Sequence, residues 1–143
     1  MLKRELVSKE QVFRYEYDGK TIFIAIDRLI RKLLNTPRID IEIDSTIAKK
    51  LIKDRSIDEK YVHKYMQDFN RIANGENVTI LPCLVIWFKD NTWVLADGNN
   101  KYVAAYMSGV KTLKALEAKR QQWAPFIVRD FDERIPDGET ILL

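Results

Sequence analysis

The chain has 143 residues, of which 46% are hydrophobic and 31% are charged, and its formal net charge is +3. These values are typical of one soluble globular domain with a core of useful size. A single cysteine, Cys83, excludes an internal disulfide, and a single histidine, His63, excludes a multi-histidine metal site. The polar N-terminal segment and the lack of an apolar run of about 18 residues predict no membrane span and a cytoplasmic, reducing location.

Two strands joined by a tight turn are predicted near the start of the chain, over residues 12–26. The turn is Asp18-Gly19, a dipeptide that favours two-residue hairpin loops. A helix is predicted next, over residues 27–34. Asp27 is its expected N-cap, because a short acidic side chain can accept a hydrogen bond from the first helical N–H groups.

Alternating isoleucines predict a short strand over residues 38–44, with Glu42 on its polar face. Glu42 serves either as a base or metal ligand, or as an ordinary exposed charge. A helix follows over residues 45–53, and its outer end is basic. Four side chains form this basic patch: Lys49, Lys50, Lys53 and Arg55. The patch either contacts a nucleic-acid backbone or is a solvated helix face.

The longest predicted helix opens on the sequence SIDE, residues 56–59, which matches a capping box. Apolar residues at helical spacing, with Phe69 in the middle, define its buried face, and Gly75 ends it. An apolar strand is predicted over residues 79–88. Cys83 lies within this strand, so we expect its thiol to be buried and slow to react.

A strand, a sharp corner and a short helix are predicted over residues 93–109. The corner is at Gly98, and Asn99 or Asn100 is expected to cap the helix. A helix N-terminus presents backbone N–H groups and a partial positive charge, a preceding glycine admits an anion, and Lys101 adds a mobile charge. The corner is therefore either a phosphate site or an ordinary strand-to-helix turn.

The sequence ADGNNKYVAAYMSGVKTLKA, residues 96–115, resembles the signature of the ParB/sulfiredoxin superfamily. Members carry a D-G-x-H-R or G-E-R-R type turn and then a helix with paired alanines. The resemblance covers residues 54–117, under half of the chain. It implies an α+β fold with a small mixed sheet and helices. The whole chain would be one stand-alone ParB-like domain, with an N-terminal hairpin and an acidic C-terminal tail, residues 129–143.

The chain departs from the family pattern within the turn. The turn contains no cysteine, which excludes sulfiredoxin chemistry. Asn100 stands where the family has His or Arg, and Lys101 stands where it has a final Arg. Asparagine cannot act as a general base, and lysine cannot form the two-pronged phosphate contact that arginine forms. These departures favour phosphate binding over the family's catalysis.

The resemblance implies a domain that binds a nucleoside triphosphate with Mg²⁺ and hydrolyses or transfers phosphate in DNA metabolism. The catalytic positions are then Asp97, Asn100 and Glu42. The binding positions are Gly98, Asn99, Lys101, Tyr102 and Arg55. Two alternatives stay open: a nucleic-acid-binding or ParB-like nuclease protein that uses the basic patch, and a non-catalytic module that binds a protein partner.

Overall fold

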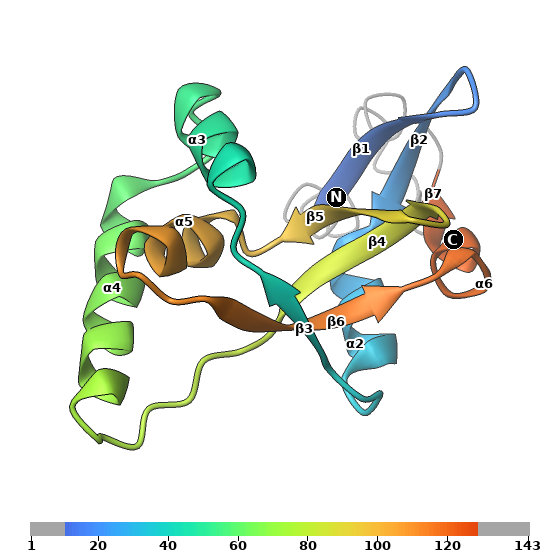
Figure 1. The fold of residues 1–143 in the computed structure, drawn as a ribbon. Coiled ribbons are helices and arrows are strands. Elements are labelled where there is room, and N and C mark those ends of the chain that lie inside the picture. Colours follow the sequence, from blue (N-terminus) through green and yellow to red (C-terminus); the bar gives the residue numbers. More distant parts are fainter. Residues whose placement is uncertain (1–10, 129–143) are drawn as a thin grey trace, which may run out of the picture. The chain divides into compact units, whose positions relative to one another are not determined.

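The computed structural model of the chain describes residues 11–128, and its ribbon is drawn in Figure 1. The fold is mixed α+β with two sheets, which confirms the predicted class at this level. The elements are β1 (Val12–Tyr17), β2 (Lys20–Ala25), α2 (Ile26–Leu33), β3 (Ile39–Glu42), α3 (Ser45–Lys53), α4 (Glu59–Ala73), β4 (Cys83–Lys89), β5 (Thr92–Asp97), α5 (Asn99–Met107), β6 (Thr112–Ala118), α6 (Arg120–Trp123), η1 (Ala124–Phe126) and β7 (Ile127–Val128). The acidic tail lies outside the described residues.

The two sheets have the strand orders β1-β2-β7 and β3-β6-β4-β5. Within the described range, the chain divides into two compact units, and the boundaries between them fall between α2 and β3, inside β4, inside β5 and at the end of β6. The first unit contains residues 11–36, 86–94 and 118–128, and the second contains residues 37–85 and 95–117. That the whole chain forms a single domain stays a prediction.

Aromatic side chains form much of the core of the first unit. The antiparallel hairpin of β1 and β2 confirms the predicted one, with Asp18 and Gly19 at positive φ in its turn. Tyr15 of β1 stacks on Phe88 of β4 with ring centroids 3.8 Å apart. Trp123 packs against Phe88 at 5.1 Å, so β1, β4 and α6 share one aromatic cluster.

The second unit is built around α5, which packs against α3 and α4 (Figure 1). Tyr102, Val103, Ala104 and Ala105 are fully buried. The paired alanines allow this close approach, because a methyl side chain adds little bulk between neighbouring elements. An apolar residue of β3 faces the core, as the alternating isoleucines predict, and it meets an apolar residue of β6 there. Ile41 pairs with Leu113 across these antiparallel strands, and both are buried.

Two predicted helix starts are wrong. Asp27 does not cap α2, since its carboxylate accepts a hydrogen bond from the Gln11 N–H at 3.1 Å instead. The SIDE sequence does not form a capping box opened by Ser56. Asp58 is the N-cap of α4, and its carboxylate accepts from the Lys60 N–H at 3.0 Å. An acidic side chain two residues nearer the helix has displaced the serine from this role.

The predicted strand over residues 79–88 begins later than expected. β4 starts at Cys83, and residues 79–82 form an irregular segment. Pro82 has no N–H to donate to a neighbouring strand, which explains why the ladder starts after it. From Cys83 to Ile86 the strand is completely buried, as its unbroken apolar sequence predicts.

Candidate functional site

The corner between β5 and α5 has the predicted form, with a different cap. Gly98 is the N-cap, at φ 105°, and Asn99 and Asn100 are the first two helical residues. The expectation that one of these asparagines caps the helix is therefore wrong. The first helical hydrogen bond runs from the Tyr102 N–H to the Gly98 carbonyl at 2.9 Å. The N–H groups of residues 99–101 thus precede the helical ladder, at the positive end of the helix dipole.

Packing alone explains the glycine at this corner. A Cβ atom added at Gly98 would lie 2.7 Å from the Cys83 Sγ and 3.1 Å from the Cys83 Cβ. The left-handed backbone and the contact with β4 both require the residue to lack a side chain. Gly98 is therefore needed whether or not an anion binds here.

The Cys83 thiol behind this corner is held in its protonated form. Burial raises the pKa of Cys83 to about 11, although the positive charge of Lys101 acts in the opposite direction. The carboxylate of Asp97 adds to the increase. A thiol with this pKa is a weak nucleophile at neutral pH, which supports the expectation of slow reactivity.

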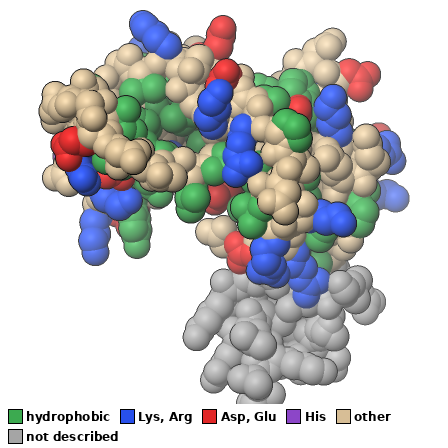
Figure 2. All heavy atoms as spheres, turned by 90° about the horizontal axis from the view of Figure 1, so that it is seen from below, with side chains coloured by type: hydrophobic (Ala, Val, Ile, Leu, Met, Phe, Trp, Pro, Cys, Tyr) green, Lys and Arg blue, Asp and Glu red, His purple; other side chains and the backbone are tan. Residues whose placement is uncertain are grey.

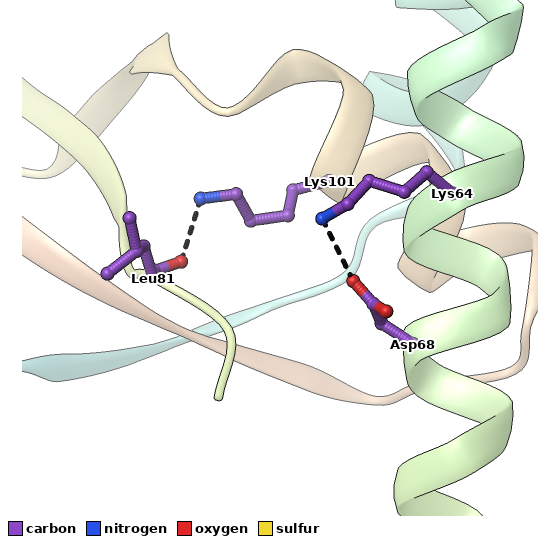
Figure 3. Close-up of polar contacts among 4 residues, drawn as sticks. All are labelled: Lys64, Asp68, Leu81 and Lys101. Atoms are coloured by element: carbon purple, nitrogen blue, oxygen red, sulfur yellow. Dashed lines mark hydrogen bonds and ion pairs between the residues drawn. The ribbon is translucent and has the colours of Figure 1, made fainter. Parts of the chain in front are cut away.

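The side chain of Lys101 is not the mobile charge that the sequence suggests. It is only 7% exposed, and its Nζ donates to the Leu81 carbonyl at 2.7 Å (Figure 3). Its Nζ also lies 5.6 Å from the centroid of the Tyr65 ring. A neighbouring lysine on α4, Lys64, instead forms an ion pair with Asp68 at 3.2 Å. Lys101 thus keeps its positive charge near the corner, while at least one of its three N–H groups is already used.

Asn99 and Asn100 connect the start of α5 to the loop between α3 and α4. Asn99 Nδ2 donates to the Ser56 carbonyl at 3.2 Å, and Asn100 Oδ1 accepts from the Asp58 N–H at 2.7 Å. We call these two bonds the asparagine clamp. Because Asn100 uses its oxygen in the clamp, it positions a loop and does not act as a base. The clamp also brings the chain segment that includes Arg55 to the corner.

Tyr102 has a similar connecting role on another side of α5. Its hydroxyl donates to the Glu42 carbonyl at 3.0 Å and accepts from the Asp44 N–H at 2.7 Å. Burial raises the pKa of Tyr102, while the hydrogen bond from Asp44 opposes that shift. The Glu42 carbonyl therefore lies next to Tyr102 of α5, although Glu42 is an exposed residue. Asp97 is half-buried directly before Gly98.

Arg55 occupies a position where the other two helices of this unit have glycine. Helices α3, α4 and α5 end in the same way, with a left-handed residue one position after the C-cap: Arg55 at φ 56°, Gly75 at φ 87° and Gly109 at φ 73°. In each, the next N–H bonds back to the helix across six residues, as in a Schellman motif. A residue other than glycine costs about 1–2 kcal/mol in this conformation.

The strain at Arg55 was not predicted from the sequence, where this residue is one cation of the basic patch and a binding position that the resemblance implies. Arg55 is exposed, so no packing contact in a core accounts for it. A strained residue that the fold does not require is a reasonable indication of function. The sequence contains one sign of this difference. Gly75 and Gly109 end their helices, whereas no glycine comes directly after the predicted helix of residues 45–53.

The remaining residues of the basic patch give less support to a nucleic-acid surface. Lys49, Lys50 and Lys53 are exposed on α3, and Lys50 forms a surface ion pair with Asp54 at 2.9 Å. Figure 2 shows the face seen from below in Figure 1, away from α3, and on that face Lys and Arg side chains are spread among hydrophobic and acidic ones. A nucleic-acid contact through this patch stays a prediction.

Residues 11–128 contain no group of three or more His, Cys, Asp or Glu side chains that could hold a metal ion. A magnesium ion at the corner would therefore need phosphate oxygens as well as a carboxylate such as Asp97. In the same range, none of the helices has the length and apolarity to cross a lipid bilayer.

Comparison with known proteins gives no match: no family model fits the chain, and no curated protein or solved structure is significantly similar to it. The resemblance to the ParB/sulfiredoxin superfamily therefore rests on the residues of the corner and its flanking elements.

Proposed function

We propose that the chain is a ParB/sulfiredoxin-like domain that binds a nucleoside triphosphate with Mg²⁺ at the N-terminus of α5. In this proposal, binding serves hydrolysis or transfer of phosphate in DNA metabolism. The observation that carries the proposal is the asparagine clamp. It joins the N-terminus of α5 to the chain segment of Arg55, an exposed residue directly before Ser56. The proposal therefore uses two kinds of donor, the backbone N–H groups of the helix start and the Arg55 guanidinium.

These two kinds of donor suit a phosphate group. The N–H groups of residues 99–101 and the helix dipole favour an anion at the start of α5. Arg55 can hold two phosphate oxygens at once, which supplies the two-pronged contact that lysine lacks. Lys101 adds positive charge from behind, with its Nζ bonded to the Leu81 carbonyl.

Magnesium fits this corner as an ion shared between protein and ligand. Mg²⁺ is commonly bound through one or two carboxylates together with substrate phosphates. Asp97 is the nearest carboxylate in sequence to the helix start, and Glu42 is a second candidate from β3. The ion would neutralise charge on the phosphates. In this arrangement Asn100 positions the loop of Arg55 and does not serve as a general base.

Calorimetric titration with ATP, GTP, CTP and UTP, each with and without Mg²⁺, tests the proposal. We expect Arg55→Gln to weaken binding about ten- to hundredfold, because a charge-assisted hydrogen bond contributes about 1.5–3 kcal/mol. Arg31→Gln, at an exposed position in the last turn of α2, is the matched control and should leave affinity unchanged. Absence of binding at millimolar nucleotide, or equal affinity of the Arg55 variant and the parent, would contradict the proposal.

A protein-interaction module is the second candidate, and an apolar groove in the second unit favours it. The groove has a volume of about 350 Å³, and its lining includes Phe69, Ile72, Leu81, Val110 and Leu113. Leu81 is 71% exposed at this groove. Such a surface suits an apolar peptide segment of a partner. Peptides selected from a displayed library should lose binding with Leu81→Asp and keep it with Met107→Asp, a control at another exposed apolar residue.

A further inference from the structure

A second pocket with a different character lies in the first unit, between the end of β1, the end of β4 and the start of α6. Its volume is about 340 Å³, within the range of small-ligand sites. The lining residues are Tyr17, Trp87, Phe88, Lys89, Asp90, Lys119, Arg120 and Gln121. Three are aromatic, three are cationic and one is acidic.

The aromatic wall of this pocket is held in place by specific contacts. The Trp123 Nε1–H donates to the Trp87 carbonyl at 3.1 Å, which fixes α6 against β4. Tyr17 packs edge-on against Trp123, with ring centroids 5.4 Å apart, and lies 5.8 Å from Phe88. The pocket is therefore formed by the folded core of this unit before any ligand arrives.

The cationic side chains of the pocket are available to an anion. Lys89, Lys119 and Arg120 are exposed, and none of them forms an ion pair with a carboxylate among residues 11–128. Arg120 instead donates from Nη1 to the Tyr17 hydroxyl at 3.2 Å, and its Cζ lies 5.8 Å from the centroid of that ring. A guanidinium and an aromatic ring are thus paired in the lining of a pocket that carries three cationic side chains and one carboxylate.

We propose that this pocket binds one nucleotide unit, with its base on the pair formed by Tyr17 and Arg120 and its phosphate at Lys89 and Lys119. Every nucleobase has a planar face that can stack on an aromatic ring or on a guanidinium. Lysine side chains bind phosphate as point charges. The same chemistry is offered by a free mononucleotide and by a nucleotide within a single strand, so the test includes both.

This site is separate from the corner at α5. It shares no residue with that corner and lies in the other compact unit, so it stands or fails independently of the proposed function. It also differs from the apolar groove in the second unit, because its cationic residues indicate an anionic ligand.

The test is a titration of the full ¹⁵N-labelled chain followed by amide chemical shifts. AMP should shift the N–H signals of residues 87–90 and 119–121. Adenosine, which lacks the phosphate, and inorganic phosphate, which lacks the base, should each bind at least about tenfold more weakly. A hexamer of adenylate gives the second arm: tighter binding than AMP assigns the site to a nucleic-acid strand, and weaker binding assigns it to a free nucleotide.

Variants connect the shifts to the named side chains. Lys119→Gln and Arg120→Gln should each weaken AMP binding about tenfold, whereas Lys32→Gln, at an exposed position of α2, should not. Lys119 has no side-chain packing role in the aromatic cluster, so its variant remains informative if Arg120→Gln disturbs the pocket. Shifts confined to residues 55–58 and 97–102, equal affinity for AMP and adenosine, or no effect of Lys119→Gln would overturn the proposal.

Discussion

Gly98 and Arg55 are two left-handed corners of the same unit, and the asparagine clamp joins the segments that contain them. At Gly98 the fold explains the residue completely, because a side chain would collide with Cys83. At Arg55 the fold would be satisfied better by glycine, as it is at Gly75 and Gly109. The glycine that a motif search emphasises therefore says little about ligands, while the strain at Arg55 is the feature that the fold leaves unexplained.

The largest expected effect comes from adding a side chain at Gly98. Gly98→Ala should destabilise the protein by about 1–3 kcal/mol through backbone strain and by a further 1–3 kcal/mol, roughly, through overpacking against Cys83. Gly75→Ala is the matched control. Its φ is also positive, but a Cβ there would meet no atom of the described chain within 4 Å. Urea denaturation should show the smaller loss for Gly75→Ala; equal losses would contradict the packing explanation.

A double variant sharpens the same comparison. Cys83→Ala removes the Sγ that lies 2.7 Å from the added Cβ, so it should recover part of the stability lost in Gly98→Ala. The same change should recover nothing in Gly75→Ala. Strict additivity of Cys83→Ala and Gly98→Ala would place the cost of the alanine in the backbone alone.

The next effect is a loss of stability at alkaline pH that depends on Cys83. The pKa of its thiol is about 11 in the folded chain, against 9.0 for an ordinary cysteine, because burial favours the neutral form. The folded state thus holds this proton more tightly than the unfolded state does. The contribution is fully present below pH 9.0 and is lost as the pH rises to about 11, which amounts to about 2–3 kcal/mol.

Lysines and tyrosines also titrate in this pH range, so the measurement is a difference. The free energy of unfolding of the parent and of Cys83→Ala should be compared between pH 8 and pH 11, roughly the range that spans both thiol pKa values. The parent should lose more stability than the variant. Parallel curves would mean that Cys83 is not buried against the Gly98 corner as described.

A smaller effect is expected from cutting the clamp itself. Asn100→Ala removes the acceptor of the exposed Asp58 N–H and should cost about 0.5–1.5 kcal/mol. Asn91→Ala, at an exposed position between β4 and β5, is the control and should be nearly neutral. If the clamp positions Arg55, nucleotide affinity should fall with Asn100→Ala as well. A variant that loses stability but keeps full affinity would separate the clamp from the site.

Local sequence patterns predicted the elements better than their ends. The hairpin turn, the helices α2 to α5 and the buried strand follow from short-range periodicity and turn residues, and Phe69 is buried on α4 as expected. Ile72, three residues after Phe69 and so on the same side of α4, is 41% exposed, because it lies at the open apolar groove. A periodicity argument shows which face is apolar, and it cannot show how far the neighbouring elements cover that face.

The candidate site was predictable in position and not in detail. The corner and its helix start were found from residues 97–101, but three side chains there are engaged in contacts with distant segments. Lys101 bonds to Leu81, and the two asparagines bond to the loop before α4. These partners are more than a dozen residues away in sequence, so no local rule identifies them. Only the missing glycine after α3 was a local signal for Arg55.

The smallest and most informative change is Arg55→Gly. Glycine adopts φ 56° without the cost that a side chain imposes, so the free energy of unfolding should rise. We expect a net gain of about 1 kcal/mol or less, because glycine also increases the conformational entropy of the unfolded chain. The same substitution removes the guanidinium, so nucleotide affinity should fall about ten- to hundredfold. Thermal melts and calorimetric titration of one preparation give both values.

Arg55→Lys should separate the two effects, because it keeps the strain and the charge but loses the two-pronged contact. Higher stability together with weaker binding would show that the chain gives up stability to keep an arginine at this corner. Higher stability with unchanged binding would leave the strain without a function and would favour the interaction module.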